Sequence, residues 1–71
     1  MEKRDLFAIR LKDLIDEKGV NLSFIEREIG VKHNTLSRYI HAKHSPQIEQ
    51  LWILSEYFGC TIDYLLGKTD Y

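Results

Sequence analysis

The chain has 71 residues, of which 44% are hydrophobic and 30% are charged, and its formal net charge is −1 at pH 7. This length suits a single domain, expected over 1–71, either alone or as the N-terminal part of a longer protein. The composition excludes a disordered chain, and no apolar run is long enough to span a membrane. Cys60 is the only cysteine, which excludes an intrachain disulfide, so we expect a reduced, cytoplasmic compartment.

The first half of the chain shows helical spacing of apolar residues, without the sustained alternation that predicts a strand. One amphipathic helix is predicted over about 3–18. Two short helices follow, over about 22–29 and 32–41, and the turn between them contains Gly30. Two short helices joined by a tight glycine-containing turn predict a helix-turn-helix.

Two further helices are predicted in the second half of the chain. One covers about 47–58 after Pro46, and a single turn covers about 62–66 between a capping Thr61 and Gly67. The fold class expected is all-α: a compact five-helix bundle with the helix-turn-helix at about 22–41. The predicted core stripe of the fourth helix consists of Ile48, Leu51, Leu54, Ser55 and Phe58.

The charge distribution is uneven along the chain. The stretch 31–48 holds Lys32, Arg38, Lys43 and all three histidines, without an acid, whereas the rest of the chain has seven basic and eleven acidic residues. This asymmetry predicts one cationic face on an acidic body, although chance clustering could also produce it in so short a stretch.

Four segments in order resemble Cro/CI-type (XRE-type) helix-turn-helix domains, which have a lambda-repressor-like fold. Residues 19–31 (GVNLSFIEREIGV) resemble the family's GLTQxxLAxxLGV, and 33–39 (HNTLSRY) resemble its recognition helix, xx[ST]ISx[WI]. Residues 45–51 (SPQIEQL) resemble NPSLETL, and 58–67 (FGCTIDYLLG) resemble LGVSxDxLLG. The resemblance implies a DNA-binding transcriptional regulator, a repressor of phage or mobile-element type, that lays its third helix in the major groove.

The chain departs from the family pattern at four positions. Leu22 replaces a glutamine that touches a phosphate, and Glu26 replaces a small alanine. Ile40 replaces an acid, and Ala42 replaces a glycine. In the family, an arginine matching Arg10 pairs with the acid that is missing here. We therefore expect Glu26 to pair with Arg10; the alternative is a solvated Glu26, with Arg10 bound to a surface acid such as Glu56.

The expected contacts with double-stranded DNA follow from the exposed face of the third helix. Asn34 suits adenine and Arg38 suits guanine, because each can form a bidentate pair in the major groove. The resemblance assigns base reading to His33, Asn34 and Arg38. Phosphate contacts are expected from Lys32, Ser37, Lys43 and His44, and from the backbone N–H groups of Leu22 and Ser23. The alternatives are that Asn34 only caps the helix and that Arg38 forms a surface ion pair.

The apolar residues of the C-terminal half exceed what so small a core can hold. We expect some of Trp52, Ile53, Tyr57, Tyr64 and Tyr71 to be exposed. The resemblance implies a homodimer on a two-fold operator, with Pro46, Ile62 and Tyr64 as interface candidates. The competing function is an antitoxin or protein-interaction module that keeps the fold but binds DNA weakly.

No metal, cofactor, membrane or small-molecule substrate is expected. His41, His44 and Cys60 could offer three ligands, but a structural zinc site takes four at regular spacing. The sequence also lacks a glycine-rich phosphate loop, paired carboxylates in an apolar setting and a plausible catalytic triad. It therefore predicts a protein that is not an enzyme.

Overall fold

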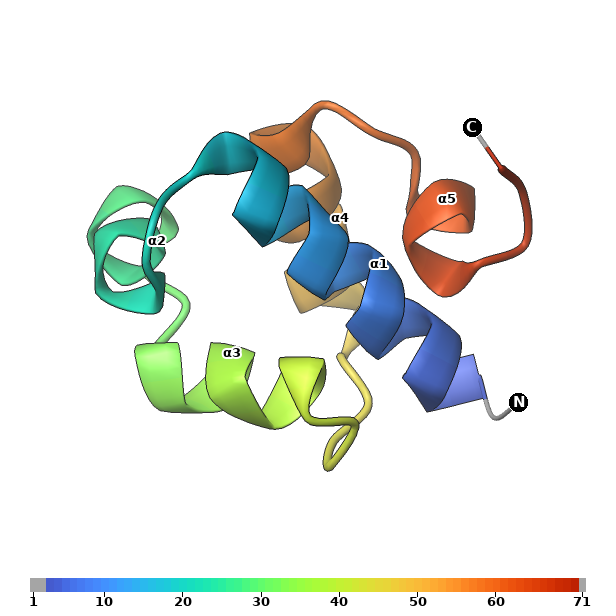
Figure 1. Ribbon diagram of the computed structural model, residues 1–71, viewed down its shortest axis with the longest axis horizontal. Coiled ribbons are helices and arrows are strands. Elements are labelled where there is room, and N and C mark those ends of the chain that lie inside the picture. The colour runs from blue at the N-terminus through green and yellow to red at the C-terminus, as the bar shows by residue number, and fades with distance from the viewer. Residues whose placement is uncertain (1–2, 71) are drawn as a thin grey trace.

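The computed structural model describes residues 3–70, which form five helices and no strand (Figure 1). They are α1 (Lys3–Lys18), α2 (Leu22–Ile29), α3 (His33–Ile40), α4 (Ile48–Phe58) and α5 (Ile62–Leu66). The predicted all-α five-helix bundle is therefore confirmed, and every predicted helix lies within one residue of its expected bounds. Among the described residues, no helix has the length and hydrophobicity needed to cross a bilayer.

Short polar side chains cap the N-termini of two helices, at the positions that the sequence predicts. The Oδ1 atom of Asn21 accepts a hydrogen bond of 2.8 Å from the backbone N–H of Phe24, and Thr61 Oγ1 accepts one of 3.0 Å from Tyr64. Each bond satisfies one of the N–H groups that the first turn of a helix leaves without a partner. These caps explain why α2 and the single-turn α5 begin where they do.

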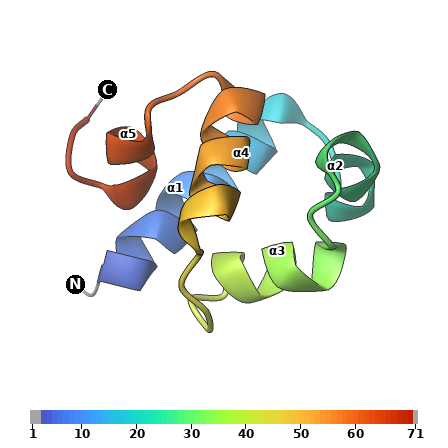
Figure 2. The same ribbon diagram turned by 180° about the vertical axis from the view of Figure 1, so that it is seen from behind.

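The long helix α1 lies across the bundle and packs against α3 on one side and α5 on the other (Figures 1 and 2). Its inward stripe places Phe7, Leu11 and Ile15 in the core, and all three are at most 7% exposed. The Phe7 ring meets the Tyr39 ring of α3 edge to face, with the ring centres 5.5 Å apart. Burial of aromatic rings in this geometry adds about 0.5–1.5 kcal/mol beyond the area that they bury.

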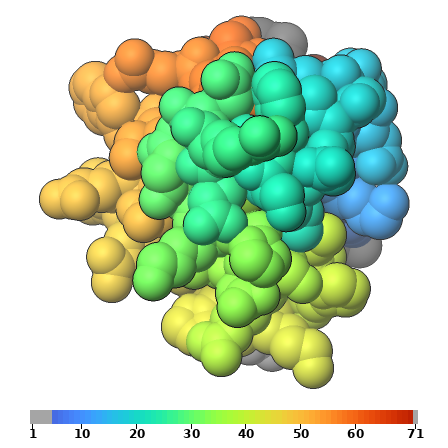
Figure 3. Space-filling model, turned by 90° about the vertical axis from the view of Figure 1, so that its left-hand side faces the viewer, coloured from blue at the N-terminus to red at the C-terminus, as the bar shows by residue number. Residues whose placement is uncertain are grey.

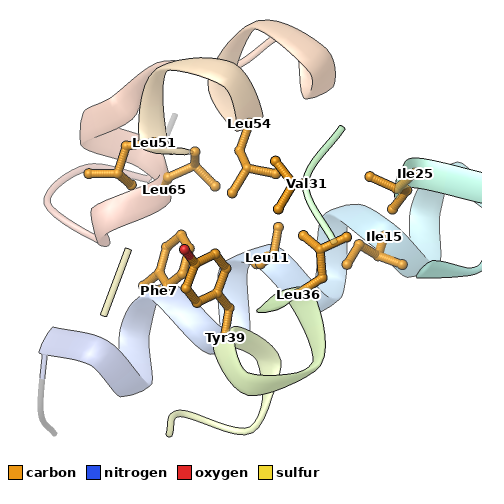
Figure 4. Packing of buried hydrophobic residues seen from close by; sticks show 10 residues of the cluster. All are labelled: Phe7, Leu11, Ile15, Ile25, Val31, Leu36, Tyr39, Leu51, Leu54 and Leu65. Carbon is orange, nitrogen blue, oxygen red and sulfur yellow. The ribbon is translucent and has the colours of Figure 1, made fainter. Parts of the chain in front are cut away.

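All five helices, together with the turn before α3, contribute to one hydrophobic core (Figure 4). Its buried members are Phe7, Leu11, Ile15, Ile25, Val31, Leu36, Tyr39, Leu51, Leu54 and Leu65. Cys60 is half-buried against this core as a free thiol, and burial raises its pKa. The helix-turn-helix is therefore an integral part of the bundle, because α2 and α3 each bury a side chain in the same core as α1.

The core stripe predicted for α4 is wrong at its first position. Ile48 is 78% exposed, whereas Leu51, Leu54 and Ser55 are buried. Ile48 is the first residue of α4, and the helix enters the core only from its second turn onward. The expectation of exposed apolar residues in this region is confirmed by Trp52, which is 60% exposed. Tyr71, named in the same expectation, lies outside the described residues.

Candidate nucleic-acid interface

The turn of the helix-turn-helix is short because a glycine ends α2 and a buried residue follows it at once. Gly30 has a φ of 78°, and its N–H donates to the carbonyl of Glu26 over 2.8 Å. A left-handed conformation of this kind costs glycine nothing, whereas it strains other residues. Val31 then enters the core at 4% exposure, and only three residues separate the end of α2 from the start of α3.

Helix α3 presents one polar face to solvent and one apolar face to the core. Leu36 and Tyr39 are buried, whereas His33, Asn34 and Arg38 are exposed and Ser37 is half-buried. Lys32, which precedes the helix as its N-cap residue, is also exposed. Figure 3 shows α2 and α3 side by side on one surface of the molecule. The structure therefore brings the five predicted α3 site residues together on or beside one outward surface.

The loop after α3 adds two more of the predicted residues to this region. Lys43 and His44 are both exposed, and the Lys43 N–H donates to the Arg38 carbonyl over 2.9 Å. Arg38 and His44 also line one polar recess of about 250 Å³ between α3 and the start of α4. Hydrogen bonding to α3 thus holds the loop beside the C-terminal end of the helix.

Two backbone groups at the start of α2 remain available to an anion. Within the described residues, the N–H groups of Leu22 and Ser23 have no acceptor, while Asn21 caps the N–H of Phe24. The Ser23 side chain is exposed, but that of Leu22 is half-buried and packs against the core. Leu22 can therefore offer a phosphate its backbone N–H only.

The alternatives for Asn34 and Arg38 do not hold in the structure. The N-cap position of α3 is Lys32, whose side chain makes no capping bond, and Asn34 lies within the helix. Arg38 forms no ion pair with any residue from 3 to 70. Both side chains are therefore free to contact a ligand on the outer face.

The expected pair between Arg10 and Glu26 is wrong. The Arg10 guanidinium lies 4.2 Å from the centre of the Tyr64 ring, donates to the Tyr64 carbonyl over 3.5 Å, and lies 3.3 Å from a carboxylate oxygen of Asp70. Arg10 therefore joins α1 to α5 and the segment after it, and neither Glu26 nor the alternative partner Glu56 is involved. The Tyr64 ring and the Asp70 carboxylate thus contact Arg10 in place of the acid that the family pattern has at the position of Ile40.

Glu26 instead contacts the first residue of α3. Its Oε1 atom accepts a hydrogen bond of 3.0 Å from the His33 backbone N–H and lies 2.6 Å from His33 Nδ1. These two contacts, with a smaller effect of the nearby Lys32 charge, lower the pKa of Glu26 below its ordinary value. Sequence reasoning missed this contact, although the lack of a capping side chain at Lys32 was a signal for it.

The candidate dimer residues lie on two separate elements. Pro46 is half-buried in the loop before α4, and Ile62 and Tyr64 are half-buried on α5. Ile62 packs against the core, and the Tyr64 ring already contacts Arg10. Only part of each side chain therefore remains accessible to a second molecule.

The part of the chain that the structure describes contains no group of three metal-binding side chains. His41, which could have paired with His44 and Cys60 around a metal, is engaged elsewhere. Its Nδ1 atom lies 2.7 Å from the Ser37 carbonyl oxygen. This contact ties the histidine to the last turn of α3.

Comparison with known proteins agrees with this arrangement. The profile of the helix-turn-helix family matches residues 11–65, and the chain belongs to that family, of the XRE type. It is 28% identical over 65 residues to the cryptic phage CTXphi transcriptional repressor RstR of Vibrio cholerae. This match covers 92% of the chain but 59% of RstR, so the chain spans well under two thirds of its relative's length. No solved structure matches the chain.

Proposed function

We propose that the chain is a sequence-specific DNA-binding repressor of the phage or mobile-element type, and not an enzyme. One observation carries the proposal: the outward face of α3 has Asn34 and Arg38 exposed and, among residues 3–70, unpaired, directly opposite the buried Leu36 and Tyr39. A helix-turn-helix protein inserts this face of its second helix into the major groove. The proposal includes a cytoplasmic location, since a repressor must share a compartment with its operator.

In the proposed complex, three side chains of α3 read bases and a ring of groups around them contacts phosphates. Arg38 pairs with guanine and Asn34 with adenine, and His33 reads a third base. Lys32, Ser37, Lys43 and His44 contact phosphates, together with the backbone N–H groups of Leu22 and Ser23. The name of the relative, a phage transcriptional repressor, supports repression rather than activation.

Salt dependence tests the phosphate contacts. Because binding releases counterions, the slope of log K against log salt is about −0.9 for each phosphate contacted. We expect a steep fall in affinity for genomic DNA fragments as the salt concentration rises. An affinity that did not change with salt would contradict the proposal.

Substitutions test the base readers. Arg38→Ala and Asn34→Ala should each cost about 1–3 kcal/mol and relax sequence preference at one position, measured by selection from a randomised pool. Lys43→Ala should weaken binding to all sequences alike. Lys12→Ala is a matched control, because Lys12 lies on α1 and pairs with Asp16 over 3.1 Å. Equal loss on every sequence from all three test variants would contradict the assignment of base readers.

The proposal includes a homodimer on a two-fold operator, formed through Pro46, Ile62 and Tyr64. The recognition helices of such a dimer lie about 34 Å apart, one turn of B-DNA. Tyr64→Asp should abolish cooperative binding to a palindrome and leave half-site binding intact. Equal loss on the palindrome and on the half-site would point to misfolding or to a different interface.

The exposed apolar residues of α4 favour a second candidate, a protein-interaction module. Trp52 and Ile53 line two shallow grooves, one shared with Ile29 and Tyr57 and the other with Ile48. An exposed tryptophan beside grooves is typical of residues that dominate protein interfaces. If Arg38→Ala leaves regulation of a reporter gene unchanged while Trp52→Glu abolishes it, this candidate is the function.

A further inference from the structure

The contact between Glu26 and His33 fixes which nitrogen of the imidazole carries the proton. A carboxylate can only accept hydrogen bonds, and the lowered pKa of Glu26 keeps it ionised at neutral pH. Its Oε1 atom lies 2.6 Å from His33 Nδ1, so Nδ1 must be the protonated nitrogen and donate to Glu26. In a neutral imidazole only one nitrogen bears a proton. The Nε2 atom of neutral His33 is therefore a bare acceptor.

The same contact also sets where that acceptor lies. Glu26 holds both the backbone N–H and the Nδ1 of His33, which anchors the imidazole at the first residue of α3. The side chain is 53% exposed, and Nε2 makes no hydrogen bond within the described residues. The N-terminal residues of a recognition helix are those that meet base edges.

We propose that Glu26 is a positioning residue for DNA specificity, which makes neutral His33 a hydrogen-bond acceptor in the major groove. The inference rests on the proposed function and restricts which base the operator has at one position. An acceptor at this place selects a base with an exocyclic amino group on the contacted strand, adenine (N6) or cytosine (N4). It disfavours guanine and thymine, which present oxygen acceptors there.

The size of the preference follows from one hydrogen bond. A neutral hydrogen bond contributes about fivefold to an equilibrium constant, and two facing acceptors add the penalty of an unsatisfied group. We therefore expect adenine or cytosine to be favoured by about fivefold to tenfold at one position in each half-site.

The tautomer is tested first, by nitrogen-15 NMR of the imidazole in the full chain without DNA at about pH 8, where an ordinary histidine is neutral. We expect the proton on Nδ1 of His33 in the wild type and in Glu26→Gln, whose amide oxygen still accepts. Glu26→Ala should shift the proton toward Nε2. A wild-type His33 protonated at Nε2 would overturn the proposal.

Selection from a randomised operator pool at the same pH of about 8, where an ordinary histidine is neutral, then tests the consequence. The wild type and Glu26→Gln should share the adenine or cytosine preference, while His33→Ala and Glu26→Ala should lose it at that position and keep the preferences set by Asn34 and Arg38. Glu28→Ala is the matched control, because it removes an exposed acid of α2 that does not contact His33. His33→Ala keeps the backbone bond to Glu26, so it tests the proposal even if Glu26→Ala fails to fold.

The outcomes separate this inference from the proposed function. A wild type with no base preference at any position refutes both. Preferences set by Asn34 and Arg38, with none lost in His33→Ala, refute only the role of His33. A Glu26→Ala protein that folds and keeps the full wild-type preference refutes the positioning role of Glu26.

Discussion

At the scale of single residues, the backbone of Ala42 is unusual. Its φ is 57°, and it is the only residue other than glycine with a positive φ in the part of the chain that the structure describes. Its N–H donates to the Tyr39 carbonyl over 3.0 Å, which holds the end of α3 in this conformation. The left-handed region costs a residue with a Cβ about 1–2 kcal/mol. Ala42 is thus strained at the position where related domains carry glycine.

Ala42→Gly should stabilise the protein. Relief of the left-handed strain exceeds the extra conformational entropy that glycine gives the unfolded chain, so we expect a gain of about 0.5–1 kcal/mol in the free energy of unfolding by urea. Ala8→Gly is the matched control: Ala8 is buried within α1, and glycine there should cost about 1 kcal/mol or more. A loss of stability in Ala42→Gly would show that its strain is not relieved.

The pKa of Glu26 predicts a pH dependence of stability. Since contacts with His33 lower this pKa in the folded state, ionised Glu26 stabilises the fold above its ordinary pKa, and this contribution is lost as the pH falls through the lowered value. The wild type should therefore exceed Glu26→Gln in melting temperature near neutral pH and lose that advantage in acid. A difference in melting temperature between the wild type and Glu26→Gln that grew below a pH of about 4 would contradict this prediction.

The partners of Arg10 and Glu26 could not be predicted from the sequence. Residue types indicate that each charge needs a partner or solvent, but they do not indicate which residue the partner is. Arg10 contacts Tyr64 and Asp70, which are 54 and 60 residues away along the chain. Contacts across such separations depend on how the helices pack in space, which residue spacing alone does not define.

At the scale of helices, most bounds could be predicted because local chemistry determines them. Asn21 and Thr61 cap α2 and α5 through bonds that span three residues. Burial was harder to predict at the helix ends. Ile48 fits the apolar spacing of α4, but only the packing of the other helices determines that its turn lies outside the core.

The end of α5 offers a prediction about close packing. A Cβ atom on Gly67 would lie 2.8 Å from the Leu6 Cβ, whereas one on Gly19 would meet nothing within 4 Å. Both glycines have positive φ, 81° and 73°. Gly19→Ala should therefore lose about 1–2 kcal/mol of stability through backbone strain alone. Gly67→Ala should lose a further 1–3 kcal/mol, roughly, because of overpacking.

Urea unfolding of the two variants, matched in chemistry and in backbone conformation, isolates the contact between α5 and α1. Equal losses would mean that Leu6 moves aside without cost. Gly67→Ala should also weaken the contacts of Arg10, because the same segment carries Asp70.

At the scale of the whole molecule, one small core supports every helix. A domain of this size has a free energy of unfolding of roughly 4–10 kcal/mol. Leu54 is fully buried, and Leu54→Ala should cost about 2–5 kcal/mol, enough to unfold much of the protein at raised temperature.

Ile48→Ala is the comparison on the same helix. Because Ile48 is 78% exposed, its truncation should change the free energy of unfolding by less than about 0.5 kcal/mol. Thermal unfolding followed by circular dichroism measures both variants. A large loss in Ile48→Ala would mean that this side chain is covered in solution.

The burial of Leu36 and Tyr39 in the common core means that α3 cannot unfold on its own without exposing them. An isolated helix of eight residues is unstable in water, so the proposed DNA-binding surface exists only while the whole bundle is folded. Hydrogen-bonded backbone amides of α3 should therefore exchange with deuterium only through global unfolding, with an opening free energy equal to that of the whole fold. An operator bound at the proposed surface should therefore stabilise the fold, and a hundredfold excess over its dissociation constant should raise the free energy of unfolding by about 2.7 kcal/mol.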